Sequence, residues 1–223
     1  MKKIFSLDSL KGGTGKSLVG TALVDVALSA GKKILIVEAD MSNPVLGKIY
    51  SDQEVYSTEL ITKEDFLELS TEIKNSDAEI TIINNAAVHS WESYGKYIIN
   101  NVNDFDAAEL NVIWVANSEK DVLEKCVDFQ EKCPAAKIHF CMNEHFAGRR
   151  GFDLWKGSKI RTKILESGGS ELTFPDIATR VASEMRNRRL RWDCIQELDF
   201  GDLIEAKEIR SEFHEILNPY INN

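Results

Sequence analysis

The sequence predicts an α/β fold: one domain over residues 1–223, with a doubly wound, mainly parallel sheet flanked by helices. Two observations lead to this prediction. Apolar runs of strand length recur along the chain, and the segments between them carry apolar residues at helical spacing. The first such strand is followed by a glycine-rich turn and then by a helix. Within the domain we expect a basic C-terminal subregion at 144–192 and a closing helix at 202–220.

The glycine-rich turn has the sequence KGGTGKS at residues 11–17. It follows the apolar run at 3–7 and precedes a helical pattern that closes at Gly31, where we expect a left-handed C-cap. Strand, glycine-rich turn and helix are the context in which this motif binds phosphates. The alternative is a loop that only turns the chain, which the lysine, the serine and both flanking elements disfavour.

The chemistry of this loop assigns a role to each part of it. Backbone N–H groups converge on phosphate oxygens, and the helix N-terminus adds partial positive charge. Lys16 would reach the outer phosphates, and the Ser17 hydroxyl would ligate Mg²⁺. The predicted nucleotide-binding residues of the loop are Gly12, Gly13, Thr14, Gly15, Lys16, Ser17 and Leu18.

A second lysine, Lys11, precedes the glycines. This arrangement resembles the deviant Walker A motif of the ParA/MinD family, which belongs to the SIMIBI class of P-loop NTPases. The resemblance implies that ATP closes two subunits into a homodimer, in which Lys11 acts on the nucleotide of the other subunit. The alternative for Lys11 is an ordinary solvated lysine at a strand end.

An acidic pair follows the second buried strand, at 33–37. The ParA/MinD family has two carboxylates here, and the second one orients the attacking water. By resemblance, Asp40 takes that role beside the Mg²⁺ ion, and Glu38 stands where the family has aspartate. The alternative is an ordinary acidic loop after a strand.

The apolar run at 79–87 resembles the strand that ends in the Walker B aspartate, but here that position is Asn84. Asparagine can accept a hydrogen bond from Mg²⁺-bound water but carries no charge. We therefore expect Mg²⁺ to be held less firmly and ATP hydrolysis to be slow, with Glu38 as a candidate for compensation. An Asn84→Asp variant would then gain turnover or Mg²⁺ affinity.

Other elements are predicted from periodicity and capping. We expect a weak strand at 54–56, a helix from Thr62 with a capping box to Asp65, and a helix at 91–102. A strand at 110–115 follows, then a helix that begins at Ser118 with Asp121 three residues on. Later elements are strands at 137–142 and 171–174, and a helix from Pro175–Asp176.

The resemblance also places residues near the adenine. An asparagine or similar polar residue just past the 137–142 strand contacts the base in the family, which makes Asn143 the candidate; a simple turn residue is the alternative. The proline-bearing loop after the last strand covers the base, which implies Pro175 and Asp176.

Charge is distributed unevenly. The net charge is −9, which argues against a surface that binds nucleic acid everywhere. Residues 137–191, however, hold 12 basic and 6 acidic residues, while the remainder holds 15 basic and 30 acidic. Within this basic region, Arg149 and Arg150 belong to a first group. By resemblance, the predicted contacts for non-specific DNA or a plasmid-encoded partner protein are Arg186, Arg188, Arg189 and Arg191; a solvated basic face is the alternative.

Composition and the last helix indicate the compartment in which the protein is expected and whether it attaches to a membrane. Hydrophobic content of 43% and charged content of 28% are typical of a globular protein. The four cysteines show no metal-ligand spacing, and there is no signal-peptide pattern, so we expect a cytoplasmic protein. The helix at 202–220 is rich in glutamate, which anionic lipid would repel, and no membrane attachment is expected.

The resemblance is most specific in residues 3–44, and the arginine-rich stretch after Phe174–Asp176 is similar to StbB/TraL-type plasmid stability and conjugation proteins. It implies an ATP-dependent dimerisation switch with weak ATPase activity, acting in plasmid stability, partition or conjugative DNA transfer. Two alternatives remain. One is an ATP-binding scaffold with little or no hydrolysis, because of Asn84, and the other is a metabolic ATP-dependent ligase or kinase.

Overall fold

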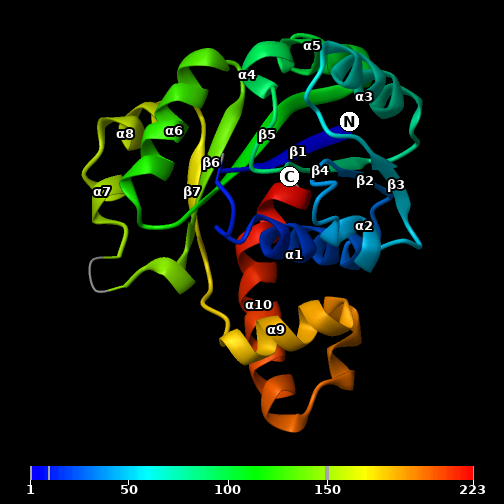
Figure 1. Ribbon diagram of the computed structural model, residues 1–223, viewed down its shortest axis with the longest axis vertical. Coiled ribbons are helices and arrows are strands. Elements are labelled where there is room, and N and C mark those ends of the chain that lie inside the picture. The colour runs from blue at the N-terminus through cyan, green and yellow to red at the C-terminus, as the bar shows by residue number, and fades with distance from the viewer. Residues whose placement is uncertain (1, 10, 149–150, 223) are drawn as a thin grey trace.

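The fold is a parallel sheet between two layers of helices (Figure 1). The computed structural model describes residues 2–9, 11–148 and 151–222. In this part of the chain seven strands pair in the order β3-β2-β4-β1-β5-β6-β7, all parallel. They are β1 Lys2–Asp8, β2 Ile34–Glu38, β3 Glu54–Ser57, β4 Ile80–Asn84, β5 Ala107–Ala116, β6 Lys137–Asn143 and β7 Ser170–Phe174.

Helices connect the strands and cover both faces of the sheet. The α-helices are α1 Lys16–Ser29, α2 Val45–Ile49, α3 Lys63–Asn75, α4 Trp91–Tyr94, α5 Lys96–Ile99, α6 Lys120–Lys132, α7 Asp153–Lys156, α8 Lys159–Glu166, α9 Thr179–Arg188 and α10 Phe200–Asn222. Short 3₁₀ segments are η1 Val102–Phe105, η2 Glu144–Phe146 and η3 Trp192–Glu197. No helix in the described ranges is both long and apolar enough to cross a bilayer.

The sheet separates two hydrophobic cores. On one face, α3 to α8 bury a cluster that includes Phe66, Trp114 and Trp155. On the other face, α1, α2, α9, η3 and α10 bury a cluster that includes Trp192 and Phe213. The central strands are apolar on both faces, as parallel sheets require, because helices cover both sides. The predicted doubly wound α/β fold is confirmed.

Local sequence signals account for several boundaries. Gly31 has a φ of 70°, which confirms the left-handed residue expected after the first helix. Thr62 and Asp65 form the predicted capping box at the start of α3, with the Asp65 N–H donating to Thr62 Oγ1 at 3.2 Å. The strands β3, β6 and β7 lie within one or two residues of the predicted positions. The run predicted at 79–87 forms a strand only at Ile80–Asn84, and β5 begins three residues before the predicted 110–115 strand.

The helix predicted at 91–102 is wrong in its continuity. The structure has two single-turn helices, α4 and α5, which meet at Gly95, and a 3₁₀ turn follows. At Gly95 the backbone packs against Trp91, and a Cβ there would meet the Trp91 carbonyl oxygen at 2.5 Å. Glycine weakens a helix interior, and here it also permits this close packing.

The starts predicted for two later helices are also wrong. The helix expected at Ser118 begins at Lys120, because the Ser118 hydroxyl donates to the Phe146 carbonyl oxygen at 2.8 Å instead of capping. The helix expected at Pro175–Asp176 begins at Thr179, because Asp176 pairs with His145 in place of a backbone N–H. The closing helix α10 runs two residues longer at each end than predicted.

The sheet register determines where the polar groups meet. Leu7 and Glu38 both align with Asn84, and Asp8 ends β1 next to Trp114 of β5. All these positions lie at the carboxyl ends of neighbouring strands, where ligands bind in open α/β sheets. The segment after β1, which holds the glycine motif, therefore opens at the same edge as Glu38 and Asn84.

His139 lies buried on β6 toward the opposite edge of the sheet. Its Nε2 lies 2.9 Å from Asn111 Oδ1 and its Nδ1 lies 2.8 Å from Ser170 Oγ. Burial, with the nearby Lys137 charge, lowers the pKa of His139 from 6.5 to about 4. The ring is therefore neutral at pH 7 and stays neutral in the folded protein well below the pH at which a free histidine is protonated.

This shift predicts a loss of stability in mild acid. Below pH 6.5 the unfolded chain binds a proton at residue 139 that the folded chain excludes, so stability falls as pH decreases. Between pH 7 and pH 5 this group contributes a loss of about 2 kcal/mol in the free energy of unfolding. In an NMR titration the His139 ring resonances should stay constant to about pH 5. A midpoint near 6.5 would contradict the prediction.

Candidate nucleotide-binding site

The KGGTGKS loop adopts a conformation that only glycine can hold at two positions. Gly13 and Gly15 have φ values of 78° and 98°, in the left-handed region. A side chain on Gly15 would also collide with the amide nitrogen of Asn143. The same amide donates a hydrogen bond to the Thr14 carbonyl oxygen at 2.9 Å. Strand β6 thus holds the loop in place from the side.

Lys16 lies within the loop at the start of α1. Its Nζ donates to the Lys11 carbonyl oxygen at 2.9 Å and to Ser9 Oγ at 3.3 Å. Burial lowers the pKa of Lys16, and the charges of Asp8 and Asp40 oppose this shift. The ammonium group therefore occupies the centre of the loop, held by neutral oxygen atoms that a phosphate can replace.

A cavity of about 310 Å³ opens beside the loop. Its walls come from the loop and α1, from the segment after β2 together with α2, and from α9. The residues that line it include Gly12, Gly13, Gly15, Lys16, Ser17, Leu18, Asp40, Asn43, Ala182, Met185 and Arg186. The predicted loop residues and Asp40 are thus brought together, except for Thr14, which is buried behind the loop.

The two acidic residues after β2 have different environments. Glu38 is fully buried, and its carboxylate accepts hydrogen bonds from Asn84 Nδ2 at 2.7 Å and from the Gly47 N–H at 3.1 Å. Burial raises the pKa of Glu38, and these hydrogen bonds oppose the rise. Asp40 lies on the cavity wall, where its Oδ1 accepts hydrogen bonds from Ser42 Oγ and the Asn43 N–H. Glu38 supports the site from behind, and Asp40 faces it.

Asn84 is the residue expected at the Walker B position by resemblance. Its amide nitrogen is used by Glu38, whereas its carbonyl oxygen Oδ1 is buried and has no hydrogen-bond partner among the described residues. A buried acceptor without a donor is costly, and a Mg²⁺-bound water would satisfy it. Ser17 supplies the hydroxyl expected of a Mg²⁺ ligand, so these two residues fit the ion. Within the described ranges no cluster of three His, Cys, Asp or Glu side chains could hold a metal by itself.

Lys11 points to α6. Its Nζ forms ion pairs with Glu119 and, at 2.9 Å, with Asp121 Oδ2. The hydrogen bond with Glu119, followed by that with Asp121, raises the pKa of Lys11. Lys11 does not line the described cavity, and its side chain is 30% exposed. The two lysines of the motif therefore have separate partners: Lys16 lies inside the loop and Lys11 lies outside it.

A buried polar group behind the loop was not foreseen from the sequence. Asp8, at the end of β1, accepts a hydrogen bond from the Ser9 N–H at 2.6 Å. Its other oxygen lies 2.9 Å from His89 Nε2, and both side chains are fully buried. His89 belongs to the segment after β4, so this contact joins that segment to the base of the glycine loop. The available signal was the acidic residue at the end of a buried apolar run.

The residues predicted near the adenine meet at the same edge of the sheet. Asn143 aligns with Phe174, so Pro175 and Asp176 lie close to it. Pro175 is buried, and Asp176 is exposed and pairs with His145 Nδ1 at 2.9 Å. One N–H of the Asn143 amide is used by the loop, which leaves its second N–H for another acceptor. These three residues do not line the 310 Å³ cavity, and their contact with a base remains a prediction.

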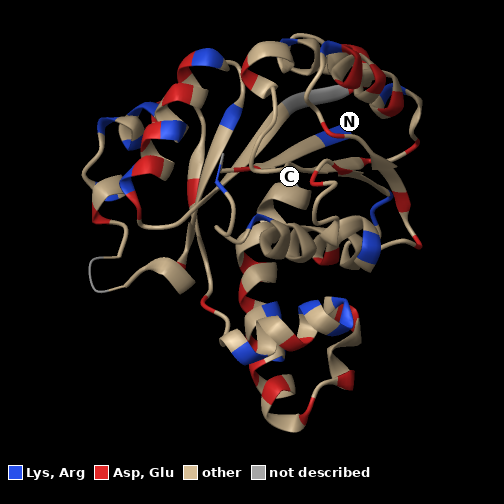
Figure 2. Cartoon of the chain, viewed as in Figure 1, with Lys and Arg blue, Asp and Glu red and all other residues tan. Residues whose placement is uncertain are grey.

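The four predicted arginines divide into two pairs. Arg188 forms ion pairs with Glu184 and Glu197, and Arg191 with Asp52 and Asp193. By contrast, Arg186 and Arg189 are exposed and pair with no other described residue. Arg186 also lines the cavity beside the glycine loop. In Figure 2 the ribbon carries basic positions on α9, and acidic positions lie on the segment that follows it and on α10. The residues Arg149 and Arg150 lie outside the described ranges.

Solved structures share this fold. MinD from Pyrococcus horikoshii OT3, complexed with Mg-ADP, matches with a TM-score of 0.58 at 18% identity, over 95% of this chain and 96% of that one. A plasmid partition protein from Borrelia burgdorferi B31, bound to AMPPNP, matches with a TM-score of 0.54 at 15% identity, over 96% and 99%. These matches show that the chain has the fold of MinD and of the plasmid partition protein, and its glycine loop lies at the corresponding first strand–helix turn of that fold.

The sequence comparison defines a narrower relation. No protein-family model matches the chain. Protein MobD from Acidithiobacillus ferrooxidans is 32% identical over 227 aligned residues, which cover 99% of each chain. The chain therefore belongs to the same family as protein MobD.

The contact between Glu38 and Asn84 predicts the effect of changing either residue. Asn84→Asp places a second carboxylate against Glu38 in a buried site, where like charges cannot both ionise easily. We expect this variant to lose about 2 kcal/mol in the free energy of unfolding at neutral pH. The double variant Glu38→Gln/Asn84→Asp exchanges amide and carboxylate and should recover most of the loss.

Urea denaturation at pH 7 measures both effects. Asn84→Leu serves as a comparison, because it removes the amide without adding a charge. Equal stability of Asn84→Asp and the unaltered protein would show that the two side chains do not interact as described.

Proposed function

We propose that the protein is an ATP-dependent dimerisation switch with slow ATPase activity. The observation that carries the proposal is the division between the two lysines of the loop. Lys16 lies where the phosphates of a bound nucleotide would be, and Lys11 lies outside the cavity, near the start of α6. Lys11 is held by Glu119 and Asp121, exposed partners that it can exchange for the nucleotide of a second subunit.

Nucleotide binding would use groups that are already positioned. Loop N–H groups bind the phosphates, and Lys16 exchanges the Lys11 carbonyl oxygen for a phosphate oxygen. Ser17 and the unpartnered Asn84 Oδ1 would hold Mg²⁺ and a water bound to it. When bound, the ion neutralises charge on the phosphates. The relatives with this fold that contain Mg-ADP or AMPPNP support an adenine nucleotide as the ligand.

Hydrolysis would depend on Asp40. Its carboxylate faces the cavity and can orient a water for attack on the terminal phosphate, while Lys11 of a second subunit stabilises the developing charge. The Walker B position carries no charge, and Glu38 directs its carboxylate to Asn84 and to the backbone. We therefore expect slow turnover.

A second candidate is a scaffold that binds ATP and dimerises without appreciable hydrolysis. The neutral Asn84 and the hydrogen-bonded carboxylate of Glu38 favour it. Size-exclusion chromatography with and without ATP and Mg²⁺, alongside phosphate release, distinguishes the two. A switch forms dimers and releases phosphate slowly, whereas a scaffold forms dimers and releases none. A protein that stays monomeric with ATP and Mg²⁺ fits neither.

We further propose a role in plasmid stability, partition or conjugative DNA transfer, through non-specific DNA or a plasmid-encoded partner. The likeness to a plasmid partition protein and membership of the MobD family support this process. Arg186 and Arg189 are the favoured contacts, because Arg188 and Arg191 are paired with acidic groups of this chain. Two exposed arginines per subunit would become four in a dimer.

Release of Lys11 should promote dimerisation. The double variant Glu119→Gln/Asp121→Asn removes both acidic partners of Lys11 and should tighten the ATP-bound dimer by about fivefold, as expected for the removal of two exposed ion pairs. Sedimentation velocity with ATP and Mg²⁺ measures the dissociation constant. The matched control is Lys120→Gln/Glu124→Gln, an exposed pair on the same helix. An unchanged or weaker dimer in the first variant would contradict this role for the acidic pair.

Removal of the exposed arginines should weaken DNA binding. Arg186→Ala/Arg189→Ala should reduce the slope of log affinity against log salt concentration by about one unit for each phosphate that the variant no longer neutralises. Arg188→Ala serves as the control, because its guanidinium is held by Glu197 and should affect stability more than binding. Binding that is insensitive to salt, or equal in both variants, would argue against direct interaction with phosphates.

A further inference from the structure

Helix α9 and its C-cap contain the arginines Arg180, Arg186, Arg188 and Arg189. Arg180 and Arg188 form ion pairs with acidic side chains of this chain. Arg186 and Arg189 are exposed and pair with no other described residue. Of these two, Arg186 lines the 310 Å³ cavity beside the glycine loop, and Arg189 does not. Arg186 is therefore the arginine of this helix that combines a place at the cavity with a guanidinium group that no described side chain engages.

The packing at the end of α9 determines where Arg186 lies. Met185 is buried in the core, and so is Leu190, directly after the helix. The Leu190 N–H donates to the Met185 carbonyl oxygen at 2.8 Å, and the Arg189 N–H donates to the Arg186 carbonyl oxygen at 3.2 Å. With Arg189 in the left-handed region at a φ of 53°, this is a Schellman motif. The last turn of α9, which carries Arg186, is thus fixed by its own backbone and by its apolar neighbours.

The charges around the cavity come from separate walls. Among the described residues that line it, Lys16 and Arg186 are basic and Asp40 is acidic. Lys16 belongs to the glycine loop, whereas Arg186 belongs to α9. The other side chains that α2, α9 and the residue after α9 contribute to the lining are apolar: Val45, Ile49, Ala182, Met185 and Leu190. On the wall that α9 forms, the Arg186 guanidinium is therefore the group that can pair with an anion.

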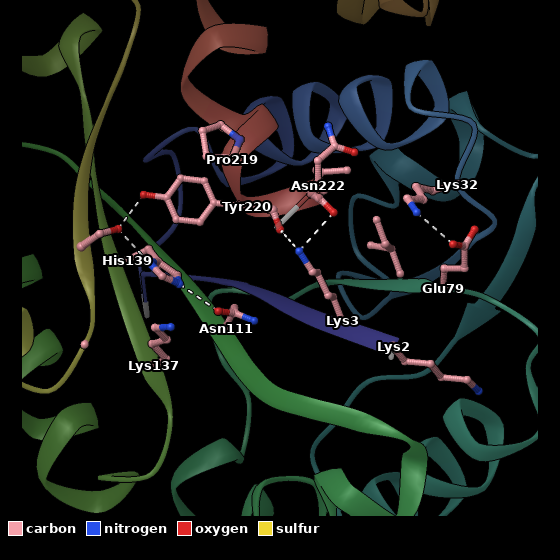
Figure 3. A pocket seen from close by; sticks show the side chains of 14 residues that line it. Lys2, Lys3, Lys32, Glu79, Asn111, Lys137, His139, Pro219, Tyr220 and Asn222 are labelled. Carbon is pink, nitrogen blue, oxygen red and sulfur yellow. Dashed lines mark hydrogen bonds and ion pairs between the residues drawn. The ribbon is translucent and has the colours of Figure 1, made fainter.

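A larger cavity, of about 600 Å³, lies at the opposite edge of the sheet, next to the end of α10 (Figure 3). Its lysines have partners within the fold. Lys32 pairs with Glu79 at 3.0 Å, and Lys3 donates to backbone carbonyl oxygens of α10. The other lysines that line it are also engaged. Arg186, by contrast, lines a cavity and has no partner in the described part of the chain.

We propose that Arg186 binds the phosphate groups of a nucleotide held in the glycine loop of its own subunit. A guanidinium group presents a planar fork of N–H donors that matches two phosphate oxygens, whereas Lys16 supplies a point charge. The outer phosphates are the expected partners, because Gly12, Gly13 and Lys16 line the same cavity as Arg186. This assignment rests on the nucleotide binding proposed above, and it adds a contact from the far end of the chain.

The assignment narrows the contacts available to DNA. With a nucleotide in the cavity, Arg186 is held by phosphate oxygens, so it contacts DNA only while the cavity is empty. Arg189 does not line the cavity and is available to DNA in both states.

The test is the affinity of the full-length protein for ADP, measured by titration calorimetry with Mg²⁺ present. ADP is used so that the result does not depend on an ATP-bound dimer. Arg186→Gln should weaken ADP binding about tenfold, as expected for the loss of a hydrogen-bonded charge pair. Arg186→Lys keeps the charge but loses the planar fork, and its affinity should lie between the two. Inorganic pyrophosphate, which has neither base nor ribose, should show the same loss in Arg186→Gln.

The matched control is Arg189→Gln, which makes the same change three residues further along, outside the cavity. It should bind ADP as tightly as the unaltered protein. Urea denaturation of each variant verifies that the fold is intact.

Equal affinity of Arg186→Gln and Arg189→Gln for ADP would overturn the proposal. A loss for ADP with unchanged affinity for pyrophosphate would overturn it as well, because Arg186 would then contact the base or the ribose. Both results leave the glycine loop as the nucleotide site. That site fails only if the unaltered protein binds no ADP, so the two failures are distinguishable.

Discussion

The site depends on one backbone turn, the left-handed bend at Gly13 and Gly15, which Asn143 holds from the neighbouring strand. This turn brings the loop to the wall of the cavity and places Lys16 at the start of α1. Any side chain at Gly15 would displace the Asn143 amide, so strand β6 and the loop constrain each other. The parallel sheet supplies the rest, because the carboxyl ends of β1, β2 and β4 bring Asp8, Glu38 and Asn84 to the same edge.

The charged and polar side chains around this turn form two sets, a buried shell and an exposed shell. In the buried shell, the Asn84 amide donates a hydrogen bond to the Glu38 carboxylate, and the Asp8 carboxylate lies next to the His89 ring. In the exposed shell, Lys11 contacts two carboxylates of α6. The buried contacts fix geometry, because unpaired charges are costly there. The exposed contacts are weak and screened, and they can be exchanged when a second charged surface approaches.

The sequence predicted the fold and the loop because both depend on local pattern: apolar runs, glycines at fixed offsets and a capping box. It did not predict the break at Gly95 or the late start of α9, since these follow from packing against Trp91 and from the pairing of Asp176 with His145. Arg188 and Arg191 were predicted DNA contacts, but acidic side chains of this chain pair with both; Glu197 lies near Arg188 in the sequence, and Asp52 lies far from Arg191. The contacts of Asp8 and Glu119 were also missed, because they join residues far apart in sequence.

The central claim is that the two lysines serve different subunits, and the molar mass of Lys11→Ala saturated with ATP and Mg²⁺ tests it most directly. Sedimentation equilibrium should give a monomer for this variant under conditions in which the unaltered protein is a dimer, with nucleotide affinity preserved. A dimer as stable as that of the unaltered protein would contradict the account, and so would a loss of nucleotide binding by the monomer.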